Sequence, residues 1–361
     1  MKILITCARA PVTIEWIEIF KKANCEIILC DSITCPISAC YKNIRFIKTP
    51  SPKLNFDLYK KKMISLINSV DLVIPNCEDI FYLSKLKKYT KNTKFFMPEH
   101  KLLLELHHKY NFLKYINDNV KTPKTKIIYN KKDIQINDHT ILKPVFSRFG
   151  KSIIRNITQK NIENIEISQN YPWVQQEKII GNPICNYAII EKGNVIAHTA
   201  YKPKYLLNNS AATYFEPHYD KRLESFINQF AKDTEYTGQV AFDFIDDGKD
   251  LYVLECNPRA TSGLHLLREN LQFINKKLIY IPKSTPTPYR VGYTLYLLFG
   301  LNALLHGKIK NLHDDYKKAK DVLSPLPWYS QPLSLSFLLI KALIKKSDPT
   351  SISTYDIEYD G

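Results

Sequence analysis

Two strands that face each other across a short turn constrain the fold of this chain more than any other segment. Gln239, Ala241 and Asp243 alternate with apolar residues in GQVAFDFID, which is typical of a half-buried strand. The turn Asp246–Gly248 suits a tight connection, because Asp and Gly tolerate the backbone angles that short hairpins need. The return strand, LYVLECN, follows directly. The segment therefore predicts a β-hairpin with one buried face.

The hairpin is expected to bring two acidic side chains together. If it folds about residues 248–250, Asp243 lies opposite Glu255, and Asn257 follows on the face of Glu255. Adjacent carboxylates on an apolar hairpin repel each other unless a cation lies between them. A few hard oxygen ligands, with room left for phosphate oxygens, suit Mg²⁺ bound with a nucleotide. Arg259 comes next, and its guanidinium can bind phosphate in a bidentate way.

Strand alternation also assigns the other side chains of the return strand. Leu251 and Val253 fall on the face of Glu255, whereas Cys256 points the other way, into the core. The alternative interpretation is a surface hairpin with scattered polar residues, and the apolar neighbours argue against it.

Composition narrows the class of protein. The 361 residues are enough for two or three domains with their own cores. The formal charge of +16 comes mostly from Lys spread along the chain, without an Arg-rich block or an aromatic-basic repeat. This pattern argues against a dedicated nucleic-acid-binding protein, and we expect no nucleic-acid partner.

Cysteine usage and the apolar runs indicate the compartment. The eight Cys include no CxxC pair and no His at zinc-finger spacing, so we expect free thiols in a reducing cytosol. The longest apolar run, 291–305, is too short to span a membrane and contains Asn302. A soluble, cytoplasmic protein is the default expectation.

The N-terminal part has an alternating β-α-β pattern. KILIT at 2–6 and EIILC at 26–30 predict strands on either side of a helix around 14–23, which implies a parallel sheet. The segment between them reads CARAP, so the dinucleotide fingerprint GxGxxG is absent. A further buried strand, 71–75, is followed by Asn76–Asp79, at the sheet edge where open α/β sheets bind ligands. The alternative for Glu78 and Asp79 is N-capping of the next helix.

A lysine inside an apolar strand is a second unusual feature. Lys143, in ILKP, needs a buried anion, because an unpaired buried ammonium is expensive. The segment 141–154 predicts a strand, a turn and a strand, and its turn contains Ser147–Gly150. The backbone N–H groups of this turn could cover phosphates, although the GxxxxGK[ST] motif is missing.

Two further segments frame this lysine. Residues 101–119 are apolar at helical spacing, and Lys109 on this predicted helix is, taken alone, one more solvated cation. Residues 173–181, WVQQEKIIG, predict a strand that runs into a glycine. Such an edge can offer backbone hydrogen bonds to a purine, with the Gln176 amide adding selectivity.

The region from Pro282 onward differs from the rest in composition. It is richer in Pro, predicts a helix near 291–305 and includes an amphipathic helix at 334–344. On a basic background this second helix could lie on a membrane. Packing against the body of the protein is the alternative that we favour.

Together these segments resemble the ATP-grasp superfamily of ATP-dependent carboxylate ligases. The matching features occur in the family's order over roughly residues 1–285: an α/β N-terminal part, Lys109 with a TPKT break, ILKP, QQEKIIG, and the D…E-x-N-P-R set. A closer resemblance is to uncharacterised members related to the carbamoyl-phosphate-synthase-like branch. It rests on PNCEDIFYL, KPVFSRFG, FDFI…LECNPRATSGLHL and the ending STYDIEYDG.

The resemblance implies an α/β (α+β) architecture with three parts. Residues 1–98 would form a Rossmann-like parallel-sheet domain. Residues 99–285 would form the ATP-grasp domain, with a small β-rich lid at about 124–180 and a central antiparallel sheet. Residues 286–361 would form a helical extension.

The resemblance also implies roles for individual residues. Lys109 and Lys143 would contact the ATP phosphates, and Arg259 with Arg148 would act on the transferring phosphoryl group. Glu255 would bridge two Mg²⁺ (or Mn²⁺) ions. The remaining positions are the mobile phosphate loop Ser147, Arg148, Phe149 and Gly150; the adenine border Gln176, Glu177, Lys178 and Ile179, chiefly through backbone groups; and the metal ligands Asp243, Glu255 and Asn257.

The sequence departs from the family pattern at three places. The loop has one Gly where relatives often have several, so its closure would rely on Ser147 and Arg148. The first metal ligand is an Asp, which has a shorter arm than Glu. The region that usually supplies an acidic ribose-binding residue reads NPICNY.

The implied function is an ATP- and Mg²⁺-dependent ligase that activates a small-molecule carboxylate as an acyl phosphate and joins it to an amine or similar nucleophile. Two alternatives stay open: a catalytically silent ATP-binding regulator or partner protein, and an enzyme that reaches a lipid-linked substrate through its C-terminal helices. The substrate would lie near the loops 9–11 and 76–79, Arg148 and the turn 262–265.

Overall fold

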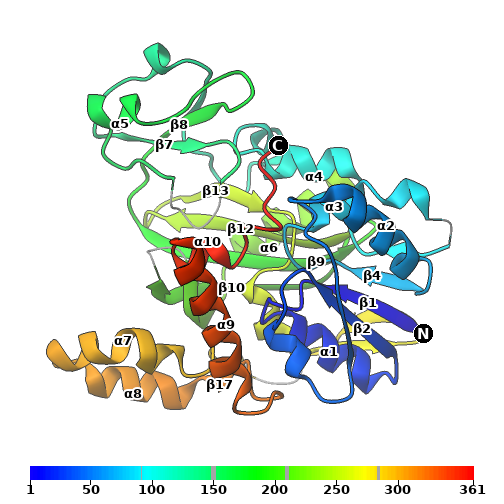
Figure 1. Ribbon diagram of the computed structural model, residues 1–361. Coiled ribbons are helices and arrows are strands. Elements are labelled where there is room, and N and C mark those ends of the chain that lie inside the picture. The colour runs from blue at the N-terminus through cyan, green and yellow to red at the C-terminus, as the bar shows by residue number, and fades with distance from the viewer. Residues whose placement is uncertain (91, 148–151, 208–210, 283–284) are drawn as a thin grey trace.

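The structure is a computed structural model with three visible parts (Figure 1). An N-terminal α/β layer packs beside a large twisted sheet, and a small group of strands, here called the lid, lies beyond one end of that sheet (Figure 1). The described residues are 1–90, 92–147, 152–207, 211–282 and 285–361.

The N-terminal layer is a five-stranded parallel sheet in the order β3-β2-β1-β4-β5. Ile3 lies opposite both Ile27 and Leu72, so the predicted β-α-β unit is confirmed. The strand order reverses between β1 and β4, which is where sheets of this kind bind ligands. The strands are β1 (Lys2–Thr6), β2 (Glu26–Asp31), β3 (Arg45–Lys48), β4 (Leu72–Ile74) and β5 (Lys94–Phe95).

The helices of this layer follow from short-range signals. Ile14, Ile17 and Phe20 recur at helical spacing and are fully buried. The helix at 56–67 begins after Asn55, whose side chain accepts a hydrogen bond from the backbone N–H of Leu58. The helices are α1 (Thr13–Lys22), α2 (Phe56–Ile67), α3 (Ile80–Ser84) and α4 (His100–His107).

The helix predicted over 101–119 is shorter than expected. α4 ends at His107, and a 3₁₀ turn at Asn111–Tyr115 follows. The ring Nδ1 of His108 accepts hydrogen bonds from the backbone N–H groups of Tyr110 and Asn111. Lys109 therefore lies on the connection after the helix, and its backbone N–H donates to the lid carbonyl of Val145.

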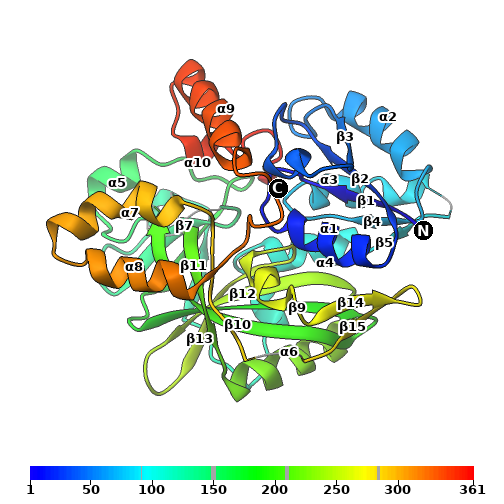
Figure 2. The ribbon, with the colours of Figure 1, turned by 90° about the horizontal axis from the view of Figure 1, so that it is seen from below.

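The central sheet has seven strands in the order β13-β12-β9-β10-β11-β16-β17. Neighbours are antiparallel except for the parallel pair β16 and β17. A helix, α6 (Lys221–Thr234), covers its outer face and places Phe226 and Phe230 against Phe242 (Figure 2). The strands are β9 (Asn182–Glu191), β10 (Asn194–Leu207), β11 (Ala211–His218), β12 (Gly238–Asp246), β13 (Leu251–Asn257), β16 (Tyr289–Arg290) and β17 (Lys320–Asp321).

The inner face of the central sheet packs on the N-terminal layer. Trp16 of α1 donates a hydrogen bond from Nε1 to the side chain of Gln239 on β12, at 3.0 Å. Gln239 donates in turn to the carbonyl of Pro75, which follows β4. This buried bridge fixes the carboxyl ends of β1 and β4 against the hairpin. A further hairpin, β14 (Leu271–Ile274) and β15 (Lys277–Tyr280), packs on α1.

The lid is a three-stranded antiparallel sheet in the order β6-β8-β7. Its small core holds Leu142 and Trp173. In the described part of the segment 141–154, the first predicted strand forms as β7, and Ile154 pairs with Leu142 through a single bridge. The elements are β6 (Thr125–Ile128), β7 (Thr140–Pro144), β8 (Trp173–Glu177) and a short helix, α5 (Gln159–Glu163).

The C-terminal part is helical but also extends the central sheet. β16 pairs with β11, and β17 pairs with β16, because Arg290 binds Asp321 at 3.0 Å across these two short strands. Among the described residues, no helix is both long and apolar enough to cross a membrane. The helices are α7 (Thr294–Leu305), α8 (Ile309–Lys318), α9 (Ser330–Lys345) and α10 (Pro349–Ile352).

Candidate active site

The predicted pair of acidic side chains forms on the hairpin. Asp243 lies opposite Glu255, although the turn itself pairs Asp246 with Leu251 and is therefore offset from the predicted centre. A β-bulge at Leu254 restores the register between the turn and the acidic pair.

The bulge changes which side chains of the return strand lie on the same face. Leu251 and Val253 are buried in the same core cluster as Cys256. Their predicted place on the face of Glu255 is wrong, because the extra residue at Leu254 inverts the alternation between them. The interpretation of Cys256 as a core residue is confirmed, and all eight cysteines are free thiols.

Two buried lysines converge on Glu255. Lys109 Nζ lies 3.3 Å from Glu255 Oε2 and donates to the carbonyl of Ser147 at 2.7 Å. Lys143 Nζ donates to the carbonyl of Leu254 at 3.2 Å. Lys109 and Lys143 are only 4% and 3% exposed, so both ammonium groups depend on this carboxylate and these carbonyls for their charge.

The surroundings shift the pKa values of the two carboxylates in opposite directions. Burial and the neighbouring Glu255 raise the pKa of Asp243 above its usual range. Burial acts in the same direction on Glu255, but Lys109 and Lys143 outweigh it and lower its pKa. Burial also lowers the pKa of Lys143 to about 8, against the opposing effect of Glu255.

The donor set fits a divalent cation. Asp243 and Glu255 offer hard oxygens side by side, the kind of ligand that divalent cations prefer. Asn257 is turned differently from the prediction: its amide nitrogen donates to Asp243 at 3.2 Å, and its oxygen accepts from Arg259. Among the described residues, no group of three or more His, Cys, Asp and Glu gathers as a metal site. The metal-binding role of all three hairpin residues stays a prediction.

Arg259 lies between the hairpin and the N-terminal layer. Its Nη2 is 3.7 Å from Glu78 and 3.2 Å from the Asn257 amide oxygen, and its side chain is 22% exposed. Glu78 is buried after β4. The neighbouring Asp79 occupies the N-cap position of α3 without a side-chain capping bond, so its side chain serves other contacts.

The strand predicted to border adenine is the central strand of the lid sheet rather than an edge. The backbone N–H of Glu177 donates to Lys124, and that of Lys178 donates to His139, both at 2.8 Å. These two N–H groups are therefore engaged within the lid. Ile179 follows the strand and is half-buried.

The Gln176 amide has a fixed orientation. Its Nε2 donates to the hydroxyl of Thr125 at 3.0 Å, and that hydroxyl donates to the carbonyl of Pro123. Because the hydroxyl proton is used, Thr125 can only accept from Gln176. Gln176 Oε1 is buried and has no partner within the described part of the chain.

Three predicted loop residues, Arg148, Phe149 and Gly150, lie outside the described residues. Ser147 is described, and its carbonyl accepts the Lys109 hydrogen bond. Its hydroxyl lies 3.4 Å from the carbonyl of Pro144.

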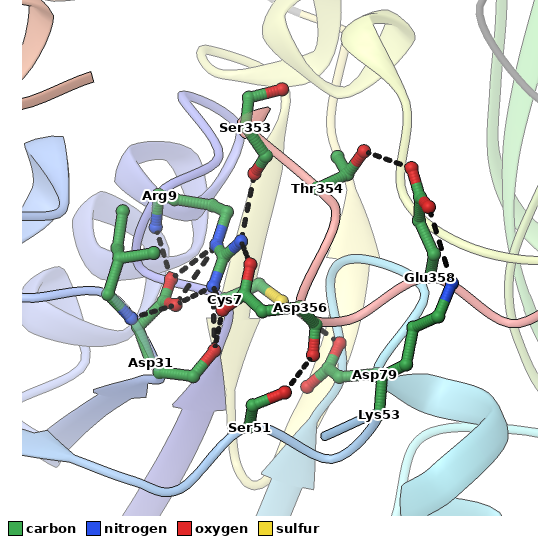
Figure 3. A network of polar contacts seen from close by, with 12 residues as sticks. Cys7, Arg9, Asp31, Ser51, Lys53, Asp79, Ser353, Thr354, Asp356 and Glu358 are labelled. Atoms are coloured by element: carbon green, nitrogen blue, oxygen red, sulfur yellow. Dashed lines mark hydrogen bonds and ion pairs between the residues drawn. The ribbon is translucent and has the colours of Figure 1, made fainter. Parts of the chain in front are cut away.

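A second charged cluster lies at the carboxyl ends of β1 and β2 (Figure 3). The Arg9 guanidinium donates to Asp31 through Nε at 3.0 Å and to Asp356 through Nη1 at 2.7 Å. Ser32 and the carbonyl of Ser353 accept further hydrogen bonds from it. The Arg9 side chain is 7% exposed, so this predicted substrate contact is already occupied by the protein's own carboxylates.

Sequence reasoning missed the role of the C-terminal tail, residues 353–361. Asp356 binds Arg9, and Tyr359 stacks on Phe81 with ring centroids 5.0 Å apart. The tail ends beside the lid residue Phe146, which a side-chain carbon at Gly361 would approach to 2.8 Å. The available signal was Arg9 itself, since an arginine directly after a buried strand needs a counter-ion.

A cavity of about 750 Å³ joins most of the regions predicted to surround the substrate. The loop after β1, the loop after β4 and the segment after β13 line it together with α9. Arg148 lies outside the described residues, and Glu78 and Asp79 do not line this cavity. The predicted residues that do are Arg9, Ala10, Pro11, Asn76, Cys77, Arg259, Ser262 and His265.

Sequence comparison assigns the middle of the chain to a class of nucleotide-dependent domains. Residues 106–263, from the end of α4 through the lid and the hairpin, match the family model of the ATP-grasp domain. The chain therefore carries an ATP-grasp domain, as its motifs indicated. Curated proteins gave no match to the sequence.

Solved structures share the fold at low sequence identity. The ADP complex of an N5-carboxyaminoimidazole ribonucleotide synthetase has a TM-score of 0.63 at 13% identity, covering 84% of this chain and 85% of that chain. The Aspergillus clavatus N5-carboxyaminoimidazole synthase with ADP and 5-aminoimidazole ribonucleotide has a TM-score of 0.62 at 11% identity, covering 84% and 86%. An L-amino acid ligase from Bacillus licheniformis has a TM-score of 0.56 at 14% identity, covering 76% and 71%.

Proposed function

We propose that this protein is an ATP- and Mg²⁺-dependent ligase that joins a carboxylate to an amine and releases ADP and phosphate. The observation that carries the proposal is the convergence of Lys109 and Lys143 on Glu255, opposite Asp243. Buried cations beside paired carboxylates suit a triphosphate with its metal ions. The likeness of the fold to ligases supports the same reaction class.

The lysines act on the phosphates. Within the described part of the chain, each uses few of its hydrogen-bond donors, since Lys109 contacts one carbonyl and Glu255, and Lys143 contacts one carbonyl. Their remaining donors can bind phosphate oxygens and offset the charge that develops during transfer. Arg259 would hold the transferring phosphoryl group from the side of the cavity.

The hairpin carboxylates hold the metal ions. Asp243 and Glu255, and Asn257 after rotation of its amide, would bind Mg²⁺ or Mn²⁺, two ions in all. Bound metal ions neutralise phosphate charge during such reactions.

The reaction balances in two steps. A carboxylate oxygen attacks the γ-phosphorus, and the bond to ADP breaks, which leaves an acyl phosphate. The amine nitrogen then attacks the acyl carbon, phosphate departs and the nitrogen loses a proton. Positioning by Lys109, Lys143 and Arg259 suffices for both steps, so no nucleophilic side chain is required.

The adenine base is expected beside Gln176. Its unpartnered Oε1 can only accept a hydrogen bond, and adenine offers an amino group where guanine has a carbonyl. This arrangement would favour ATP over GTP. The partners of the reaction are small molecules, and we place it in the cytoplasm.

Release of ADP with a panel of carboxylates and amines tests the proposal. Wild-type protein is expected to release ADP only with an accepted pair. Glu255→Gln should lower this rate at least about a hundredfold, because the lysines and metal ions lose their shared carboxylate. Glu216→Gln is the matched control: it lies on the same sheet, pairs with Lys204 and has a side chain 30% exposed, against 28% for Glu255. Tight ATP binding without turnover of any pair would instead favour a silent ATP-binding regulator.

A further inference from the structure

The 750 Å³ cavity beside Arg259 has two chemically different walls. One wall consists of loops and carries polar groups, including Asn76 and Ser262. The other wall is α9, which contributes the apolar Phe337, Ile340 and Ile344 and also Lys341. α9 packs near the N-terminal layer (Figure 1). The cavity is lined by loops of that layer, by the segment after β13 and by this helix. Its lining therefore changes from polar to apolar across its width.

The α9 wall leaves apolar surface uncovered by protein. Phe337, Ile340 and Ile344 are 47%, 56% and 74% exposed, although they line a cavity. Their spacing places them on one face of the helix. Water against such surface is unfavourable, and a ligand in the cavity would displace it.

The polar wall offers one arginine whose contacts are loose. Arg9 is locked between Asp31 and Asp356 by short hydrogen bonds. Arg259 lies 3.7 Å from Glu78 and makes its hydrogen bonds at 3.2 Å, with part of its side chain exposed. A carboxylate entering the cavity can therefore pair with Arg259 beside the hairpin.

We propose that the acid activated at this site is amphipathic, with its carboxylate at Arg259 and a long apolar chain along Phe337, Ile340 and Ile344 of α9. This inference deepens the proposed ligase function and rests on it. It also gives the C-terminal extension a role, because α9 supplies the wall that selects the substrate.

A lipid surface is the alternative occupant of the apolar helices. Leu339 and Leu343 of α9 and Leu301 of α7 are also exposed, but they do not line the cavity. A bilayer would cover these residues without reaching Arg259. Because apolar residues of α9 and polar residues of the loops line one cavity, we favour a ligand with both an apolar and a polar part.

A hydroxylamine trap measures acid activation without the natural amine. The acid's oxygen attacks the γ-phosphorus of ATP and ADP leaves; the hydroxylamine nitrogen then attacks the acyl carbon, phosphate leaves, and a hydroxamate forms. We expect kcat/KM to rise along the series acetate, hexanoate and dodecanoate, used below micellar concentrations. Each buried methylene contributes about fourfold, so dodecanoate should exceed hexanoate at least about a hundredfold.

Two neighbouring residues of α9 provide a matched pair of variants. Ile340 and Leu339 are 56% and 51% exposed, but only Ile340 lines the cavity. Ile340→Asp should lower kcat/KM for dodecanoate at least about tenfold, and for dodecanoate more than for acetate, because a carboxylate would replace one apolar contact. Leu339→Asp should stay within about twofold of wild type for every acid.

Calorimetric binding of dodecanoate to the full chain separates the two proposals. In one outcome, wild type and Leu339→Asp bind dodecanoate, Ile340→Asp does not, and no acid yields hydroxamate. This outcome would support the apolar site and contradict the ligase function. Hydroxamate from short acids, with no effect of chain length and none of Ile340→Asp, would overturn the apolar site and support the ligase. In the third outcome, the protein does not bind dodecanoate, and Ile340→Asp and Leu339→Asp lose co-sedimentation with anionic vesicles equally. This outcome would overturn the apolar site in favour of a lipid surface.

Discussion

The pKa values of two aspartates, the buried Asp356 and the half-buried Asp243, are shifted in opposite directions. Burial would raise the pKa of Asp356 in the tail, but the Arg9 guanidinium outweighs it and holds this pKa at about 2. Burial also acts on Asp243 in the hairpin, where the adjacent Glu255 adds to it and the pKa is raised. An aspartate is therefore stabilised as an anion by a neighbouring cation at Asp356, whereas at Asp243 the neighbouring groups disfavour the charged form.

The difference lies in the partners that the protein itself provides. Asp356 accepts from Nη1 and Nη2 of one guanidinium at 2.7 and 2.9 Å. Asp243 accepts from the neutral amide of Asn257 at 3.2 Å, and the described residues give it no ion pair. The tail network is complete without a ligand, as expected of a structural device. The hairpin cluster has no such complete network among the described residues, which supports the proposal that a ligand binds there.

The comparison predicts the largest effect for Lys143, a lid lysine that contacts the hairpin. Lys143→Met should lower the rate of ADP release at least about a hundredfold, because a phosphate-binding cation is lost. The free energy of unfolding should stay level or rise by about 1 kcal/mol, since an apolar side chain replaces a buried ammonium with one carbonyl contact. Steady-state kinetics and urea unfolding measure the two quantities.

An exposed lysine of the same lid sheet is the control for this variant. Lys126→Met should change neither quantity appreciably, because Lys126 lies at the surface of β6. Loss of several kcal/mol of stability in Lys143→Met would show that the hairpin cluster is as structural as the tail network.

Removal of the Arg9 guanidinium, which binds the tail, should instead lower stability. Arg9→Met should lower the free energy of unfolding by about 3 kcal/mol, because two buried carboxylates lose their cation. Urea unfolding measures this loss. Arg45→Met, an exposed arginine on β3, is the control and should change stability by less than about 0.5 kcal/mol. Equal losses in the two variants would contradict the structural role of the Arg9 network.

The parts of the fold that the sequence predicts are those with short-range signals. Alternation and turn chemistry predict β1, β2 and the hairpin, since each depends on neighbouring residues. The opposition of Asp243 and Glu255 was also predicted, but the turn is offset and the bulge at Leu254 compensates. Lys109 was placed on a helix because apolar spacing continues past His108, whose ring ends the helix through local hydrogen bonds.

Contacts between distant segments were not predictable. Arg9 and Asp356 are 347 residues apart, and no local pattern states which carboxylate meets which guanidinium. The same holds for the approach of Lys109 and Lys143 to Glu255, which depends on how the lid sits on the central sheet. The resemblance to a family supplied the association of these residues, and the geometry supplied their contacts.

The tail network should make stability depend on acid pH. The folded-state pKa of Asp356 is depressed to about 2, so its contribution is present above the unfolded value of about 3.9 and is lost as pH falls toward 2. Wild type should exceed Asp356→Asn by about 2 kcal/mol at pH 6, and the difference should fall by about half at pH 3. Urea unfolding between pH 6 and pH 3 measures it.

A second tail aspartate controls for general effects of acid. Asp360 is 51% exposed and pairs with Lys53 at the surface. Asp360→Asn should stay within about 0.5 kcal/mol of wild type at every pH. A pH-independent difference between Asp356→Asn and wild type would show that Arg9 does not depress the Asp356 pKa.

The smallest effect is expected on the lid side of the nucleotide site. Gln176→Ala should raise the KM for ATP about fivefold, since one hydrogen bond contributes about 1 kcal/mol, and should leave the KM for GTP unchanged. Gln175→Ala is the control: Gln175 precedes it on β8, and its amide binds Gln135 and Thr140 within the lid. Loss of the Gln175 amide can weaken packing within the lid but should change the KM values for ATP and GTP equally. If Gln176→Ala also changes the KM values for ATP and GTP equally, Gln176 Oε1 does not distinguish the two bases. Its role would then be structural, within the lid.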